Sequence, residues 1–320
     1  MLTALAWALV VVLGLVMLLR MVAWDAAEPL VVANSLTVEL YLPAWVVAGV
    51  AFARKRRLLG AAALVLVAGQ AALVAPELLA SGPVPAWAAH APAVRVLDAN
   101  VYAGNPSMAG YARAIDGYRP DLVTLQEASP SDLAQLRRAG ALARLPHVVD
   151  VARYDPAAFV VASRYPLGPA RVRSVDGSPY LVQTSLLLPS GTVDLWVVHT
   201  AAPLPSTWRQ WSDELGSVDR LLAARPGGTR GLLVVGDFNA TWQNRDFRRL
   251  LAGGLQDGAA ARAHAFDMTW SQTMPVLPPL VRIDHVLTGS GLTVTRIATG
   301  AGPGSDHRLV RATVAVRPGG

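Results

Sequence analysis

The chain has 320 residues, a formal net charge of +6, 53% hydrophobic residues and no cysteine. Its length allows one large domain plus an appendage, and its mean hydropathy of +0.37 is high for a purely soluble protein. The lack of cysteine excludes disulfide bonds, thiolate zinc sites and a cysteine nucleophile.

The positive charge is spread thinly. Residues 1–92 hold five basic and four acidic groups, which leaves 23 basic and 18 acidic groups for residues 93–320. This excess suits an anionic substrate, but Lys55 is the only lysine beside 27 arginines, which is also what a coding bias produces. The charge therefore indicates no strongly cationic clamp.

Three apolar stretches predict a membrane region over residues 1–79. The first has no charged residue, the second contains Glu39 near one end, and the third has only Gln70 as a strongly polar group. Each approaches the roughly 20 residues that cross a bilayer. The stretches are residues 1–19, about 36–53, and 58 to about 75.

The sequence RKRR at residues 54–57 predicts the orientation of these spans. Basic turns tend to stay in the cytoplasm, so the N-terminus is expected inside and everything after Pro76 outside, as part of a multi-pass cell-membrane protein. Two alternatives stay open. The first stretch could be a cleaved signal peptide, although it lacks a basic n-region, and Glu39 could be functional rather than interfacial.

Residues 80–92, ASGPVPAWAAHAP, have no hydrophobic period and predict a partly extended linker before a domain over residues 93–316. Short apolar strands there alternate with amphipathic helices, which favours two packed sheets flanked by helices. Helices are expected over 107–118, 129–140 and near 206–223. Strands are expected over 93–102, 121–128, 157–163, 180–188, 192–200 and 231–238, and near 281–288, 293–299 and 308–316.

Polar side chains follow or end these strands, and they are the candidate site residues. One such residue alone is weak evidence, because Asp and Asn are ordinary turn formers. The set is Asn100, Glu127, His199, Asp237, Asn239, Asp284, Asp306 and His307.

The segment GDFN illustrates the expected geometry. Alternate side chains of an extended segment point the same way, so Asp237 and Asn239 can face one point while Phe238 packs behind them. Such a pair can orient a water molecule beside a phosphate. The alternative is an Asx turn that has only a structural role.

In their order and spacing, these motifs resemble the endonuclease/exonuclease/phosphatase superfamily over about residues 93–316. The matching segments are LDANVY, LQEA, ASRYPL, VVHT, GDFNAT, RIDHVL and GSDHRLV. The resemblance implies a four-layered α-β-β-α sandwich, an α/β fold, with the active site at one edge and a divalent cation, usually Mg²⁺, with Mn²⁺ or Ca²⁺ as alternatives.

The resemblance also implies a role for each candidate. Glu127 is similar to the main metal carboxylate, assisted by Asn100 and Asp306. Asp237, beside Asn239, resembles the residue that orients or deprotonates the attacking water. His307 resembles an essential histidine polarised by Asp284, and His199 resembles a second histidine that contacts the phosphoryl group.

Some residues depart from this pattern or lie outside it. Tyr102 stands where some nucleases of the group carry a charged residue, which puts metal and phosphate contacts on that strand in doubt. His285 should face away from Asp284 and be structural. Trp242 and Trp270 could stack on a base or sugar, although tryptophan is more often a core or lipid-facing residue. The remaining histidines have no partner motif: His90, His147 and His264.

The function expected from these observations is a membrane-anchored, metal-dependent phosphoesterase acting outside the cytoplasm. Its substrate could be nucleic acid, a phospholipid head group or a soluble phosphate ester, and beyond the lipid bilayer no protein partner is expected. The alternative is a non-catalytic binding module that keeps the fold. A serine hydrolase is excluded because the chain has no G-x-S-x-G elbow.

Overall fold

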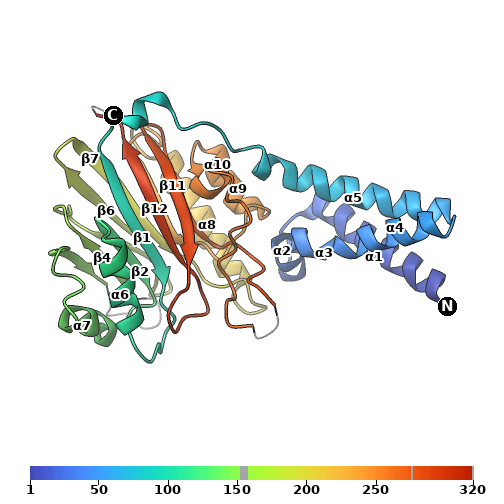
Figure 1. The fold of residues 1–320 in the computed structure, drawn as a ribbon, viewed down its shortest axis with the longest axis horizontal. Helices are drawn as coiled ribbons and strands as arrows, with labels where there is room; N and C mark the ends of the chain where they lie inside the picture. The colour runs from blue at the N-terminus through green and yellow to red at the C-terminus, as the bar shows by residue number, and fades with distance from the viewer. Residues whose placement is uncertain (152–157, 275–276, 319–320) are drawn as a thin grey trace.

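The computed structural model describes residues 1–151, 158–274 and 277–318 (Figure 1). Helices fill the first 78 residues, and from Ala93 onward two six-stranded sheets pack face to face with helices on their outer sides. The expected α/β sandwich is therefore confirmed. Residue 157, the start of one expected strand, lies outside the described residues.

Each sheet mixes parallel and antiparallel neighbours. The first sheet has the order β11 (Leu292–Gly300), β12 (Leu309–Val316), β1 (Ala93–Asn100), β2 (Leu122–Gln126), β4 (Phe159–Ser163) and β3 (His147–Asp150). The second has the order β5 (Arg171–Val175), β6 (Ser178–Leu188), β7 (Gly191–His199), β8 (Leu232–Asp237), β10 (Asp284–Thr288) and β9 (Gln256–Asp257).

Helices cover the outer faces, so central strands such as β2, β4 and β8 are buried on both sides, whereas the edge strand β5 is largely exposed. One cluster of apolar side chains fills the space between the sheets, and one further cluster lies under the helices of each outer layer. The first sheet carries α6 (Ala109–Tyr118) and α7 (Pro130–Arg138), and the second carries α8 (Trp208–Ala223) and α9 (Arg245–Ala252). The short helices are η1 (Ala86–Ala89), inside the expected linker, and α10 (Gly258–Ala261).

The N-terminal helices form a bundle that extends from one side of the sandwich (Figure 1). They are α1 (Leu2–Ala23), α2 (Glu28–Ser35), α3 (Thr37–Leu40), α4 (Leu42–Ala53) and α5 (Arg57–Leu78). By length and composition, α1 and α5 can each cross a membrane. The second expected span corresponds to α3 and α4, and α2 is bent away from them by 80°. Together, α2, α3 and α4 form a third candidate span only if the two parts of this bent pair are treated as one unit.

The bent helix α2 docks on the sandwich. Val31 is completely buried in the same apolar cluster as Phe247 beneath α8 and α9. The carbonyl oxygen of Val31 also accepts a hydrogen bond from Asn244 Nδ2 at 3.3 Å. The helical bundle and the sandwich therefore share a packed interface, and the connection between them is more than a tether.

Asp98 is a carboxyl group buried between the two sheets. Its side chain lies on the same face of β1 as Val96 and Asn100, and Oδ1 accepts from Thr124 Oγ1 at 2.6 Å and from Gln126 Nε2 at 2.9 Å. Oδ2 has no hydrogen-bond partner in the part of the chain that the structure describes. Burial raises the pKa of Asp98 to about 7, because charging a carboxyl group away from water is unfavourable.

This raised pKa makes stability depend on pH in a definite direction. The folded chain holds the proton up to about pH 7, whereas the unfolded chain loses it near 3.8, so stability falls as the pH rises through this window. The cost above the window is on the order of 4 kcal/mol. We expect Asp98→Asn to raise the thermal unfolding midpoint, relative to wild type, more at pH 8 than at pH 5. An equal difference at both pH values in detergent-solubilised protein would contradict this assignment.

Candidate active site

Strand pairing brings the candidate residues to one edge of the sandwich. In the second sheet, Asp237 at the end of β8 lies in register with His199 on parallel β7 and with Asp284 on antiparallel β10. In the first sheet, Asn100 ends β1 beside the end of β2, which Glu127 follows. Residues far apart in the chain therefore meet where the two sheets face each other.

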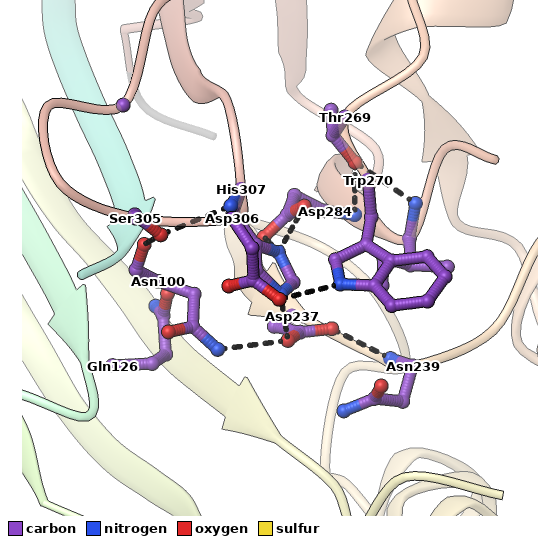
Figure 2. A network of polar contacts seen from close by, with 12 residues as sticks. Asn100, Gln126, Asp237, Asn239, Thr269, Trp270, Asp284, Ser305, Asp306 and His307 are labelled. Atoms are coloured by element: carbon purple, nitrogen blue, oxygen red, sulfur yellow. Dashed lines mark hydrogen bonds and ion pairs between the residues drawn. The ribbon is translucent and has the colours of Figure 1, made fainter. Parts of the chain in front are cut away.

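His307 lies between two buried aspartates, as Figure 2 shows. Its Nδ1 is 2.9 Å from Asp284 Oδ2, and its Nε2 is 3.7 Å from Asp237 Oδ2. Burial opposes the charged ring, but Asp284 and Asp237 outweigh it and raise the pKa of His307 to about 10. At neutral pH this residue is therefore an imidazolium that can stabilise negative charge.

Asp237 is the second titrating group of this cluster. Burial raises its pKa, and the His307 cation offsets part of that effect, which leaves the pKa at about 6. Its Oδ1 accepts from the backbone N–H of Asn239 at 2.8 Å, which is the geometry of an Asx turn. The turn and the cleft position expected for this segment thus occur together, and Phe238 is buried behind them as expected.

The backbone around Asp237 has to be shaped for this turn. Asn239 has a positive φ of 46°, and its Nδ2 donates to Thr200 O at 2.9 Å. Gly236 has a φ of 131°, and a Cβ there would lie 2.0 Å from Val198 O. Because only glycine fits that close approach, Gly236 lets β8 reach the edge with Asp237 pointing into the cleft.

Glu127 and Asn100 link the two sheets at the same point. Asn100 Nδ2 donates to Glu127 Oε1 at 2.8 Å and to Asp237 Oδ2 at 3.0 Å (Figure 2 includes the second contact). Glu127 Oε2 accepts from Ala103 N at 2.6 Å, and Glu127 has a positive φ of 59°. A left-handed glutamate is costly for the backbone, and such conformations concentrate at functional sites.

Asp306 comes from the loop between β11 and β12. Its Oδ2 accepts from Trp270 Nε1 at 2.9 Å, and in the described part of the chain no group donates a hydrogen bond to Oδ1. Ser305 shapes this turn, as expected, because its Oγ donates to Asn100 O at 2.8 Å and accepts from His307 N at 3.0 Å. The loop thereby sets the position of Asp306 relative to β1.

All eight candidates except Asp284 line one cleft of about 560 Å³, and Asp284 lies directly behind His307. His199 Nε2 is 3.5 Å from Glu127 Oε1, while its buried Nδ1 has no hydrogen-bond partner among the described residues. Apolar groups such as Leu204 and Tyr102 form part of the wall, and among the described residues no arginine or lysine lines the cleft. Among the described lining residues, the acidic groups of the cleft therefore have no arginine or lysine beside them.

Two sets of groups could hold a divalent cation. Asp237, Asp284 and His307 offer ligand atoms within 4.8 Å of one another. However, Nδ1 of this ring already contacts Asp284 Oδ2 at 2.9 Å, and a metal ligand needs a ring nitrogen without its proton. Glu127 and Asp306 offer oxygen atoms to the cleft, with Asn100 next to them. Hard oxygen donors of this kind fit Mg²⁺, which keeps several waters, better than the histidine set does.

Some of the site was not evident from the sequence. The sequence predicts that Trp270 either stacks on a base or sugar or is a core or lipid-facing residue, but it anchors Asp306, and Thr269 Oγ1 accepts from the backbone N–H of Asp284 at 3.3 Å. Nothing local in the sequence marks either contact. Trp242 does not line this cleft, and His285 faces away from it as expected, with Nε2 2.9 Å from Ala240 O.

Comparisons with known proteins agree with this geometry. A family model described as "Endonuclease/Exonuclease/phosphatase family" matches residues 99–307. No curated protein matches the chain. Among solved structures, an endonuclease/exonuclease/phosphatase from Beutenbergia cavernae aligns with a TM-score of 0.55 and 18% identity, covering 70% of this chain and 72% of that one.

Two further structures were solved with DNA. A D. rerio TDP2 complexed with single-strand DNA product has a TM-score of 0.55 and 16% identity, covering 70% of this chain and 99% of its own. A 3′ phosphatase, NExo, from Neisseria, bound to a product DNA hairpin, has a TM-score of 0.54 and 15% identity, covering 68% and 98%. At these identities the likeness concerns the fold. Together with the family match over most of the sandwich, it places the chain in the endonuclease/exonuclease/phosphatase family.

Proposed function

We propose that this protein is a membrane-anchored, divalent-metal-dependent phosphoric ester hydrolase. Members of its family typically hydrolyse phosphate esters. The observation that carries the proposal is the imidazolium of His307 between Asp284 and Asp237, in the same cleft as the oxygen donors Glu127 and Asp306. The catalytic unit is residues 93–316, the membrane helices lie within residues 1–79, and residues 80–92 connect them.

Glu127, Asp306 and Asn100 are the residues that would hold the cation. When bound there, Mg²⁺, or Mn²⁺ or Ca²⁺ in its place, would neutralise charge on the phosphoryl oxygens. His307 supplies further positive charge. His307 is cationic at neutral pH and can donate to a phosphoryl oxygen from Nε2, and His199 lies across the cleft floor beside Glu127.

Asp237 is the proposed acceptor of the proton from the attacking water. Its pKa of about 6 leaves it ionised at neutral pH while keeping it basic enough to act, which suits a general base. Asn239 lies two residues away on the same wall and orients the water. The carboxylate of Asp284 lies 2.9 Å from Nδ1 of His307, so its proposed role is to fix the orientation and charge of the ring.

The substrate class that the cleft favours is a phosphoester carried by the membrane. A polynucleotide presents several phosphates, which basic side chains usually neutralise, and no lysine or arginine among the described residues lines the cleft. The wall also contains Leu204 and Tyr102. The two DNA-bound structures keep nucleic acid as the competing class, and soluble esters are the third.

The activity test uses the full-length chain in lipid nanodiscs. We expect Mg²⁺-dependent hydrolysis of bis(p-nitrophenyl) phosphate that a chelator abolishes and added Mg²⁺ restores. Phospholipid vesicles, single-stranded and duplex oligonucleotides and inositol phosphates are offered in parallel, and we expect turnover to be greatest with phospholipid. Activity undiminished in excess chelator would refute the metal assignment.

Single-residue variants distinguish hydrolysis by this protein from hydrolysis by a contaminating enzyme. Asp237→Asn and His307→Gln should each lower the rate by at least ~10²-fold, the usual worth of one acid–base group. His264→Gln, which changes a surface histidine paired with Asp267, should be neutral. No turnover of any substrate by the folded wild type would instead support a non-catalytic binding module.

We infer that the helices cross the cell membrane and that the catalytic unit lies outside the cytoplasm. Many apolar side chains of α1, such as Leu5, Val12 and Leu15, are exposed on the protein surface, which suits contact with lipid. The N-terminus and the basic turn at residues 54–57 both lie at the end of the bundle away from the sandwich (Figure 1). Basic turns favour the cytoplasmic side, so the sandwich belongs on the opposite side.

Reporter fusions test this orientation. A periplasmically active phosphatase reporter fused after residue 56 should be inactive, and the same reporter after Gly320 should be active, because only the second is expected to be exported. A cytoplasmically fluorescent reporter at each position should give the complementary pattern. The reverse pattern at both positions would overturn the orientation.

A further inference from the structure

The last membrane helix carries a buried carboxylate into the sandwich. Glu77, the next-to-last residue of α5, is only 7% exposed, and its Oε1 accepts from Arg282 Nη2 at 2.6 Å. Arg282 is itself 4% exposed. A buried ion pair of this kind is costly to break, because removing one partner leaves the other charge uncompensated away from water.

Arg282 also contacts a second carboxylate, which lies close to a histidine. Its Nη1 donates to Asp257 Oδ2 at 2.7 Å, and that oxygen is 2.9 Å from His285 Nδ1. Burial alone would raise the pKa of Asp257, but Arg282 and His285 together lower it below its ordinary value. Both carboxylates are thus tied to one guanidinium, and the cluster is ionic.

This cluster contacts the backbone of the segments that carry the active-site residues. Arg282 stands two residues before Asp284, and His285 directly follows it. The Nε2 of His285 is 2.9 Å from the carbonyl oxygen of Ala240, the residue after Asn239. In addition, Phe238 N donates to Ile283 O at 2.9 Å. The segments that carry Asp237 and Asp284 are therefore bound to each other and to this cluster.

A second group from the membrane helices holds the same loop. At the end of α1, Arg20 Nη2 donates to Gln243 Oε1 at 3.1 Å and Trp24 Nε1 donates to Gln243 O at 3.1 Å. Asp25 Oδ2 accepts from Arg245 N at 2.6 Å. Gln243 is only four residues beyond Asn239, so both attachments of the bundle reach loops that carry proposed catalytic groups.

We propose that Glu77 is a positioning residue for the active site: through Arg282 it fixes the segment that bears Asp284, and with it the orientation of His307. The membrane helices are then part of the support of the catalytic cleft. This inference rests on the proposed function only for its kinetic readout. Its physical basis is that catalytic groups must be held within about 0.5 Å, so loss of a buried anchor two residues away is felt in the rate.

The test compares Glu77→Ala, Glu77→Gln and wild type as full chains in nanodiscs of one composition. Activity is measured well below the unfolding midpoint of each variant. Glu77→Ala should lower kcat by ~10-fold or more while changing KM far less, since the substrate-binding groups remain. Glu77→Gln keeps an oxygen that accepts from Arg282 and should recover part of kcat.

Glu39→Gln is the matched control. Glu39 belongs to the same bundle and lines a small cavity at the same interface, but its Oε2 accepts no hydrogen bond from the described residues. It should leave kcat unchanged. A residue that only stabilises the fold would lower the unfolding midpoint and leave kcat of the folded protein at its wild-type value. That outcome for Glu77→Ala and Glu77→Gln overturns the proposal.

Hydrogen–deuterium exchange supplies a readout that does not require activity. Faster exchange in β10 and in residues 238–243 of Glu77→Gln, with α7 unchanged as an internal reference, supports the positioning role. Unchanged exchange in both segments contradicts it. If wild type hydrolyses no substrate, the proposed function fails, and exchange still decides whether Glu77 holds these segments.

Discussion

The interaction on which the site depends is an imidazolium held between two buried carboxylates. Asp237 and Asp284 face each other across β8 and β10, where the β pairing puts them in register. Two carboxylates buried this close repel each other, and His307 compensates them. Because the charge of His307 is fixed by its neighbours, the residue is suited to stabilising a phosphoryl group, and the raised pKa of Asp237 suits it to accept a proton.

Glu127 and Asp306 are the other two carboxylates proposed for the chemistry of the cleft. Glu127 and Asp306 are near no arginine or lysine among the described lining residues, and their compensation comes from Asn100, His199 and Trp270 as hydrogen-bond donors or weak partners. A hard cation bound there would complete the balance of charge and bring the phosphoryl group to His307. In the proposed mechanism the two groups of acidic residues therefore have different roles, although both lie at or near strand ends.

Much of this arrangement could be predicted from sequence because it follows from local rules. Alternation places Asp237 in the cleft and Phe238 behind it, and the order of the strand-end motifs identifies the family. Other features have no local signal. The contact between Glu77 and Arg282 spans 205 residues, Trp270 reaches Asp306 from a segment outside the named strands and helices, and the bend after α2 accompanies the packing of Val31 on the sandwich. Such pairings depend on how the finished elements pack, which a single sequence does not encode as a periodic pattern.

The position of the bound cation tests most directly whether Glu127 and Asp306 bind the metal while His307 stays hydrogen-bonded to Asp284. Crystals of the full chain grown with Mn²⁺ allow the ion to be located by its anomalous scattering. We expect one ion bonded to oxygen atoms of Glu127 and Asp306 and completed by waters, with His307 still hydrogen-bonded to Asp284. An ion bonded to the ring of His307, between Asp237 and Asp284, would contradict the account.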